Sequence, residues 1–197
     1  MSSKAKVLDC SFMGIVQLED MLQVSPHALY AAASNIEVKS EEKNDSKLDM
    51  HSLKLCSNQI STIATLPHVL SEILEEPSGL RWLDLSCNEI EEIGEALAGY
   101  GELAVLYLHG NRIAAFPELR RLAERCNLAK LRSLTLHGNP VADNKHYRNY
   151  LIHFIPSLNQ LDFSPITRLD RDRAATWATT FRKKLGRSRG QDDPEAP

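Results

Sequence analysis

One stretch of eleven residues constrains the fold of this chain more than any other. Residues 103–113 read Leu-Ala-Val-Leu-Tyr-Leu-His-Gly-Asn-Arg-Ile, which is the pattern L-x-x-L-x-L-x-x-N-x-I. Leu106 and Leu108 alternate with their neighbours, and a period of two places both leucines on one face of a β-strand. One such strand cannot bury its leucine face alone, so the pattern predicts further copies that stack beside it.

Three more full copies and one shortened copy are present, and they share the leucine positions. They are Met50, Leu53, Leu55, Asn58, Ile60; Leu80, Leu83, Leu85, Asn88, Ile90; Leu131, Leu134, Leu136, Asn139, Val141; and Leu158, Leu161, Phe163, which lacks the Asn. The second leucines lie at 53, 83, 106, 134 and 161, so successive copies are 30, 23, 28 and 27 residues apart. Repeats of this length and pattern are leucine-rich repeats. Unrelated amphipathic strands would not explain an Asn that recurs at a fixed offset.

The repeats predict an α/β leucine-rich repeat solenoid, with a parallel concave β-sheet and with helices and loops on its convex side. The spacing of apolar residues predicts convex helices within 63–76, from Pro117 to about Cys126, and within 143–154. Gly99 and Gly101 predict a tight return without a full helix between the second and third full repeats.

The chain divides into three predicted segments: an N-terminal capping segment with a charged linker at 1–49, the repeat domain with its cap at 50–167, and a C-terminal helix with a basic tail at 168–197. Apolar residues from Leu8 to Leu22 fit either a helix or a strand. They would cover the first repeat, whose core otherwise meets water, or would fold on a partner. Ser25-Pro26 is a plausible helix start, and the charged residues 37–49 predict an exposed loop.

The cysteines indicate a reducing compartment. Cys10, Cys56, Cys87 and Cys126 show no paired spacing and do not lie where secreted repeat proteins place disulfides. The N-terminus is a poor signal peptide, and no apolar run approaches the roughly 20 residues that span a membrane. We therefore expect a cytoplasmic protein that does not contact membranes.

No catalytic motif is present. The sequence lacks a nucleophile elbow, a phosphate-binding loop and a paired zinc motif, so we expect neither enzymatic activity, nor a small-molecule substrate, nor a cofactor. His109 and His137 should be neighbours on adjacent strands, but a third metal ligand is lacking, so no metal site is expected.

The strand residues between the leucines should line the concave face, where partners could bind. The candidate partner-binding residues are Trp82, Asp84, Val105, Tyr107, His109, Thr135 and His137. Exposed aromatic side chains act as anchors in protein interfaces. The alternative is that the N-terminal segment folds over Trp82 and Tyr107.

A basic tail is the second candidate surface, because residues 168–189 carry eight basic and two acidic side chains. Its candidate residues are Arg182, Lys183, Lys184, Arg187 and Arg189. The tail could be a solvated segment, or could bind an acidic protein surface such as a tubulin tail, or could bind RNA. Nucleic acid is the weakest of the three, because the basic cluster has no interleaved aromatic residues.

The end of the repeat region resembles the C-terminal cap of intracellular leucine-rich repeat proteins, in which a helix and a last strand seal the solenoid. The matching residues are Asn139-Pro140-Val141, Tyr147-Arg148, Leu151-Ile152, Pro156, Leu158, Leu161 and Asp162. A closer similarity, to one group within this family, extends from residue 8 to about 184. It is carried by Leu8-Asp9-x-Ser11-Phe12, Trp82-Leu83-Asp84-Leu85-Ser86, residues 105–111 and 131–140, Asp162-Phe163-Ser164, Asp170-Arg171 and Trp177.

This resemblance implies a small intracellular adaptor without enzymatic activity, in organisms with motile cilia. It therefore suggests a structural role in the axoneme of cilia or flagella, with axonemal or tubulin-associated protein partners. No residue pattern shows that cilium link by itself. Other members of the family target enzymes such as phosphatases or scaffold ribonucleoproteins, so these two functions are the alternatives.

Overall fold

The computed structural model describes residues 7–34, 46–126 and 128–187, and these form an open sheet of seven strands in sequence order. The strands are β1 Leu8–Asp9, β2 Ser52–Lys54, β3 Trp82–Asp84, β4 Val105–Tyr107, β5 Ser133–Thr135, β6 Gln160–Leu161 and β7 Ser164–Pro165. Strands β1 to β6 are parallel, and β7 pairs with β6 in the antiparallel sense. The predicted parallel sheet is confirmed, with one additional strand at each end.

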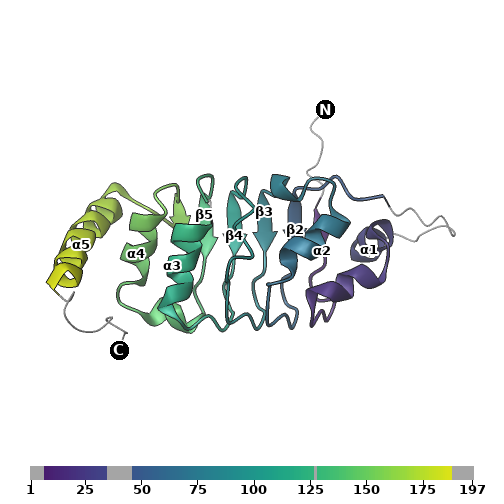
Figure 1. The fold of residues 1–197 in the computed structure, drawn as a ribbon, viewed down its shortest axis with the longest axis horizontal. Coiled ribbons are helices and arrows are strands. Elements are labelled where there is room, and N and C mark those ends of the chain that lie inside the picture. Colours follow the sequence, from purple (N-terminus) through teal and green to yellow (C-terminus); the bar gives the residue numbers. More distant parts are fainter. Residues whose placement is uncertain (1–6, 35–45, 127, 188–197) are drawn as a thin grey trace.

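Helices cover one face of this sheet and both of its ends (Figure 1). The helices are η1 Leu18–Gln23, α1 Pro26–Ala33, α2 Leu66–Ile73, η2 Pro77–Gly79, α3 Phe116–Arg125, η3 Pro140–Asp143, α4 Tyr147–Phe154 and α5 Arg168–Arg187. The three predicted convex helices correspond to α2, α3 and α4. No helix lies among the described residues between β3 and β4, which are joined by turns and one isolated bridge at Glu92, as the two glycines predict.

The core is a stack of leucines in register. Leu53, Leu83, Leu106, Leu134 and Leu161 are paired from strand to strand, and each is no more than 1% exposed. Because successive side chains of a strand point to opposite faces, the residues between the leucines lie on the face away from the helices. We call that face the concave face.

The recurring Asn joins each repeat to the one before it. The Asn111 side chain donates to the carbonyl oxygens of Leu108 in its own repeat and of Leu85 in the previous repeat, at 2.9 and 3.0 Å. Its amide oxygen accepts from the backbone nitrogen of Ile90, at 3.0 Å. Asn58, Asn88 and Asn139 make the same bonds to their own and the preceding units.

The turn before each Asn needs a left-handed backbone. Ser57, Cys87, Gly110 and Gly138 occupy this position with φ between 54° and 70°. At Gly138, a Cβ atom would lie 3.3 Å from the backbone nitrogen of Gly110. Glycine is therefore favoured there by both the backbone angle and the close approach of the neighbouring turn.

The N-terminal segment forms a degenerate repeat at the edge of the sheet. Leu8 pairs with Leu53, and Asp9 and Ser11 reproduce the bond between Asp84 and Ser86, with the hydroxyl donating to the carboxylate at 2.6 Å in both pairs. The described N-terminal residues therefore extend the sheet sideways and do not lie over Trp82 and Tyr107.

The predicted exposed loop at 37–49 agrees only in part with the structure. Residues 37–45 lie outside the described residues. At the end of the loop, however, Leu48 is 5% exposed and its N–H donates to the carbonyl of Ile73 at 2.8 Å. The repeat core therefore begins before residue 50.

The C-terminal cap departs from the expected strand. The spacing of the shortened copy placed Phe163 inward, as the third leucine of a repeat. Instead β6 ends at Leu161, and a two-residue turn reverses the chain into β7. Asp162 and Phe163 both have positive φ, 52° and 59°, which fits a type I′ hairpin turn. Phe163 is consequently 50% exposed.

Helix α5 closes this end of the molecule by packing on α4. Ala174 and Ala178 of α5 are buried. Trp177 donates its indole N–H to Nδ1 of His146, at 3.0 Å, and its ring lies 6.1 Å from that of Tyr150. The apolar side of the predicted C-terminal helix thus covers α4.

Candidate functional site

Five aromatic rings gather on the concave face, and we call them the aromatic strip. Its members are Trp82 of β3, Tyr107 of β4, His109 and His137 after β4 and β5, and Phe163 of the β6–β7 turn. Centroid distances are 6.2 Å from Trp82 to Tyr107 and 5.5 Å from Tyr107 to Phe163. These are within the range of edge-to-face aromatic contacts. The strip therefore continues across four neighbouring strands.

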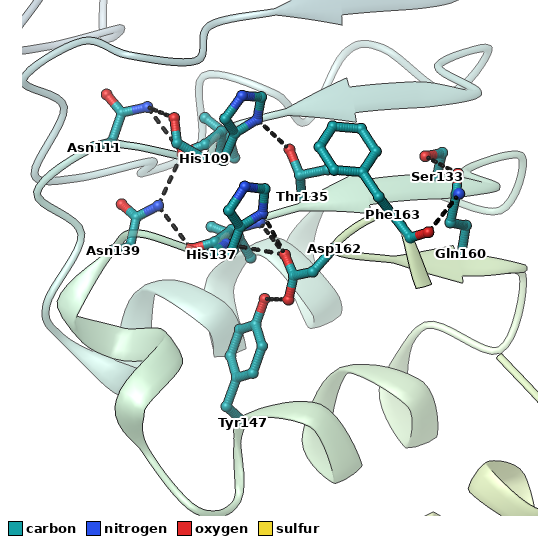
Figure 2. Close-up of polar contacts among 12 residues, drawn as sticks. His109, Asn111, Ser133, Thr135, His137, Asn139, Tyr147, Gln160, Asp162 and Phe163 are labelled. Atoms are coloured by element: carbon teal, nitrogen blue, oxygen red, sulfur yellow. Dashed lines mark hydrogen bonds and ion pairs between the residues drawn. The ribbon is translucent and has the colours of Figure 1, made fainter. Parts of the chain in front are cut away.

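The Phe163 ring is positioned by the residue before it. One carboxylate oxygen of Asp162 accepts from the backbone nitrogens of Leu136 and His137, at 2.7 and 2.9 Å, and the other accepts from the Tyr147 hydroxyl at 2.8 Å (Figure 2). A bulky residue with positive φ costs of the order of 1–3 kcal/mol and persists only where its surroundings hold it. The Asp162 bonds supply that restraint, and Phe163 lies 5.6 Å from each histidine ring.

The two histidines stack on each other. Their ring centroids are 4.7 Å apart and their planes differ by 7°. Nδ1 of His109 lies 2.8 Å from the Thr135 hydroxyl, and Nδ1 of His137 lies 3.4 Å from Asp162 (Figure 2). Burial, followed by the nearby His137, lowers the pKa of His109, and this outweighs the opposite influence of Asp84 and Asp162.

This lowered pKa predicts a loss of stability in weakly acidic solution. Above its ordinary pKa of 6.5, His109 is neutral in both the folded and the unfolded chain. As the pH falls through that value, the unfolded chain binds a proton that the folded chain still excludes, so the free energy of unfolding decreases. We expect wild type to lose more stability than His109→Gln between about pH 7.5 and 5.5, measured by urea unfolding. Equal losses in the two proteins would contradict the assignment to His109.

Lys54 extends the site toward the N-terminal edge. Its ammonium lies 5.1 Å from the centroid of the Trp82 ring, within the distance of a cation–π contact, and 3.4 Å from a carboxylate oxygen of Asp9. The N-terminal strand thus helps to position a cation on the concave face.

The structure brings together four of the seven predicted concave residues, namely Trp82, Tyr107, His109 and His137, in the strip. Val105 is half-buried between Trp82 and Ser133. Asp84 and Thr135 face the same way but are only 8% and 0% exposed, because Ser86 and His109 bond to them. They support the surface from below and expose little area themselves, and their role in binding stays a prediction.

Phe163 is the member of the strip that sequence reasoning missed. The sequence contained an indication that this copy ends differently, because it lacks the Asn that joins each full repeat to the one before it.

The basic tail is described only as backbone. Helix α5 reaches Arg187, but the side chains of Arg182, Lys183, Lys184 and Arg187, and the whole of Arg189, lie outside the described residues. Their role in binding stays a prediction. In the part of the chain that the structure describes, no cluster of three or more His, Cys, Asp or Glu could hold a metal. No helix among the same residues is long and apolar enough to cross a membrane.

Comparison with known proteins gives the family. The sequence model described as "Leucine-rich repeat" matches residues 44–192. Leucine-rich repeat-containing protein 51 from Bos taurus and from Homo sapiens is 36% identical over 170 residues, which is 86% of this chain and 83% of each relative. U2 small nuclear ribonucleoprotein A′ of Emericella nidulans is 34% identical over 124 residues, covering 62% of this chain and 49% of that protein.

A solved structure agrees with these matches. In the crystal structure of the Drosophila melanogaster SNF/U2A′ complex, a chain 27% identical to this one superimposes with a TM-score of 0.56, over 68% of this chain and 75% of that one. This chain belongs to the leucine-rich repeat family, and over most of its length it is similar to leucine-rich repeat-containing protein 51.

Proposed function

We propose that this protein is a non-catalytic adaptor that binds another protein through the aromatic strip. The observation that carries the proposal is a row of rings on the concave face, outside the core. Phe163 is 50% exposed, and the His137 side chain is 47% exposed. Aromatic side chains contribute large contact areas with few rotatable bonds, which makes them effective anchors.

The sheet beneath the strip is suited to recognition because it is already ordered. Each strand is held by its neighbours and by the Asn bonds, and Phe163 is fixed through Asp162. A surface that is preorganised in this way loses little conformational entropy on binding. The rings can therefore act together on one partner.

The cellular setting that we propose is the axoneme of motile cilia or flagella, and it enters through the sequence resemblance alone. The name of the relatives that cover most of the chain, leucine-rich repeat-containing protein 51, states no such role. Two alternatives are the targeting of an enzyme such as a phosphatase, and the scaffolding of a ribonucleoprotein. The second alternative is favoured by the likeness to U2A′, which was solved in complex with SNF.

Removing the two largest strip residues should strongly weaken partner capture. We expect Trp82→Ala combined with Tyr107→Ala to weaken binding about 30-fold or more, because a single interface anchor contributes roughly 2 kcal/mol. The measurement is affinity capture from a ciliated-cell extract, followed by titration of the captured partner against both proteins. Circular dichroism would first establish that the variant is folded.

The matched control is Phe12→Ala combined with Met13→Ala, since these two side chains are 79% and 43% exposed on the N-terminal edge. Capture that survives in the Trp82 and Tyr107 variant, or that fails only in the control, would place binding elsewhere. Capture of enzymes or ribonucleoproteins in place of axonemal proteins would keep the adaptor proposal and replace its cellular setting.

A further inference from the structure

We infer that the partner segment is an α-helix whose apolar side is edged by two carboxylates seven residues apart. The inference rests on the proposed function, because it specifies the chemistry of the segment that the aromatic strip receives. Two features carry it: the charges at the beginnings of the strands, and the spacing of those charges across the sheet.

A row of residues lies immediately before the strands, at the edge of the sheet where the strands begin. Backbone hydrogen bonds of 2.8 Å run from Arg81 to the carbonyl of His51, from Ala104 to Arg81, from Arg132 to Ala104 and from Asn159 to Arg132. The row is therefore continuous from β2 to β6. Arg81 and Arg132 are exposed in it, two strands apart with Ala104 between them. We call this row the cationic rim.

The carboxylate that lies near the rim, Glu102, is shared between Arg81 and Lys130. Glu102 is a carboxylate close to Arg81, but both of its oxygens lie 2.6 Å from the ammonium of Lys130, and that bond lowers the pKa of Glu102. Neither Arg81 nor Arg132 forms an ion pair within the described ranges. One guanidinium nitrogen of Arg132 donates to the carbonyl of Ser157 at 2.9 Å, which orients the group and leaves its other N–H donors for a ligand.

The acidic side chains on the face itself are engaged by other groups, and Asp9 lies 3.4 Å from the Lys54 ammonium. Asp84 is 8% exposed and accepts from Ser86. Asp162 is engaged by two backbone nitrogens and by Tyr147. A partner therefore meets the rings of the aromatic strip, from Trp82 at the beginning of β3 to Phe163 after β6, and two exposed arginines immediately before β3 and β5. The complementary surface is apolar with a carboxylate edge.

The spacing favours a helix that lies across the strands. Neighbouring strands are about 4.8 Å apart, so the backbone positions of Arg81 and Arg132, which are two strands apart, are separated by about 10 Å. A helix rises about 1.5 Å per residue, so side chains at i and i+7 are about 10.5 Å apart, and successive turns match successive strands. An extended peptide would seek backbone partners at a sheet edge, and the concave face offers only side chains.

The test uses a yeast-displayed library of random amphipathic helical peptides, sorted for binding to the full chain. The sort is counter-selected with the variant Trp82→Ala, Tyr107→Ala. We expect the enriched helices to carry Asp or Glu at two positions seven residues apart, beside leucine or aromatic residues. Arg81→Glu combined with Arg132→Glu should weaken the selected helices about tenfold or more, because it replaces two attractive contacts with repulsive ones. The same variant should enrich helices with Lys or Arg at those positions.

A control of equal net charge is Arg168→Glu combined with Arg173→Glu, two exposed positions of α5, which should change affinity less than twofold. Enriched helices that depend on Trp82 and Tyr107 but show no acidic preference would overturn this inference and leave the proposed function standing. A library that yields no helix dependent on the strip would also overturn this inference, whereas the proposed function fails only if capture of the natural partner survives Trp82→Ala combined with Tyr107→Ala.

Discussion

Replacing Asn111 by alanine is expected to lower the free energy of unfolding by about 3 kcal/mol. The side chain is 5% exposed, and its removal leaves the backbone N–H of Ile90 without an acceptor inside the core. A buried donor without a partner costs about 1–3 kcal/mol, and the lost donor bonds add to this. The carbonyls of Leu85 and Leu108 keep a partner, because Asn88 and Asn139 also donate to them.

That sharing predicts how pairs of Asn substitutions combine. Asn88→Ala with Asn111→Ala should cost about 1 kcal/mol more than the sum of the single changes, because the Leu85 carbonyl then loses both side-chain donors. Asn58 and Asn111 share no acceptor, so that pair should be additive. The measurement is urea unfolding in a stabilising osmolyte, which keeps the double variants folded.

The control for the single change is Asn159→Ala, whose side chain is exposed and which should change stability by less than about 0.5 kcal/mol. A similar loss in Asn111→Ala and Asn159→Ala would show that the buried amide bonds do not join the repeats.

The repeat core was predictable because its pattern is dictated by local geometry and repeated. Alternation fixed which strand residues face inward, and the second leucines pair across the sheet as the spacing predicts. The N-terminal strand was not assigned because its copy has Cys10 for a leucine and Met13 for the Asn. The sequence did contain one indication of this strand, because Asp9 and Ser11 have the same spacing as Asp84 and Ser86. That spacing reflects a hydrogen bond between the two side chains, which hydrophobic periodicity does not detect.

The binding surface was predictable in direction but not in accessibility. The alternation of apolar and other residues along each strand identifies the residues of the concave face. Trp82 and Tyr107 lie on that face in adjacent strands. Periodicity does not reveal that His109 covers Thr135, because this contact depends on side-chain rotamers across two strands. Phe163 was misplaced for a different reason. Asp-Phe is not a usual hairpin pair, and the chain is held in that turn by the contacts of Asp162 and by the bond from the Gln160 side chain to the Phe163 carbonyl.

The second large effect is expected at Asp162, which connects the stability of the cap to the strip. Asp162→Ala should lower the free energy of unfolding by about 3–4 kcal/mol, because the Tyr147 hydroxyl and the Leu136 N–H are both buried and would lose their acceptor. It should also release the Phe163 ring from the histidines. Guanidinium unfolding measures the first effect. The ring-current shifts of the His109 and His137 ring protons measure the second.

Three variants separate these contributions. Asp162→Asn keeps an acceptor for the backbone nitrogens and tolerates the positive φ, so it should lose only about half as much stability as alanine. Tyr147→Phe removes the same hydroxyl bond from the other side, and a double-mutant cycle with Asp162→Asn should show that the two changes are not additive. Asp172→Ala, at an exposed position of α5, is the matched control. If Asp162→Ala resembles this control and the histidine shifts stay in place, the turn is held without the Asp162 carboxylate, and Phe163 does not depend on Asp162 for its place on the concave face.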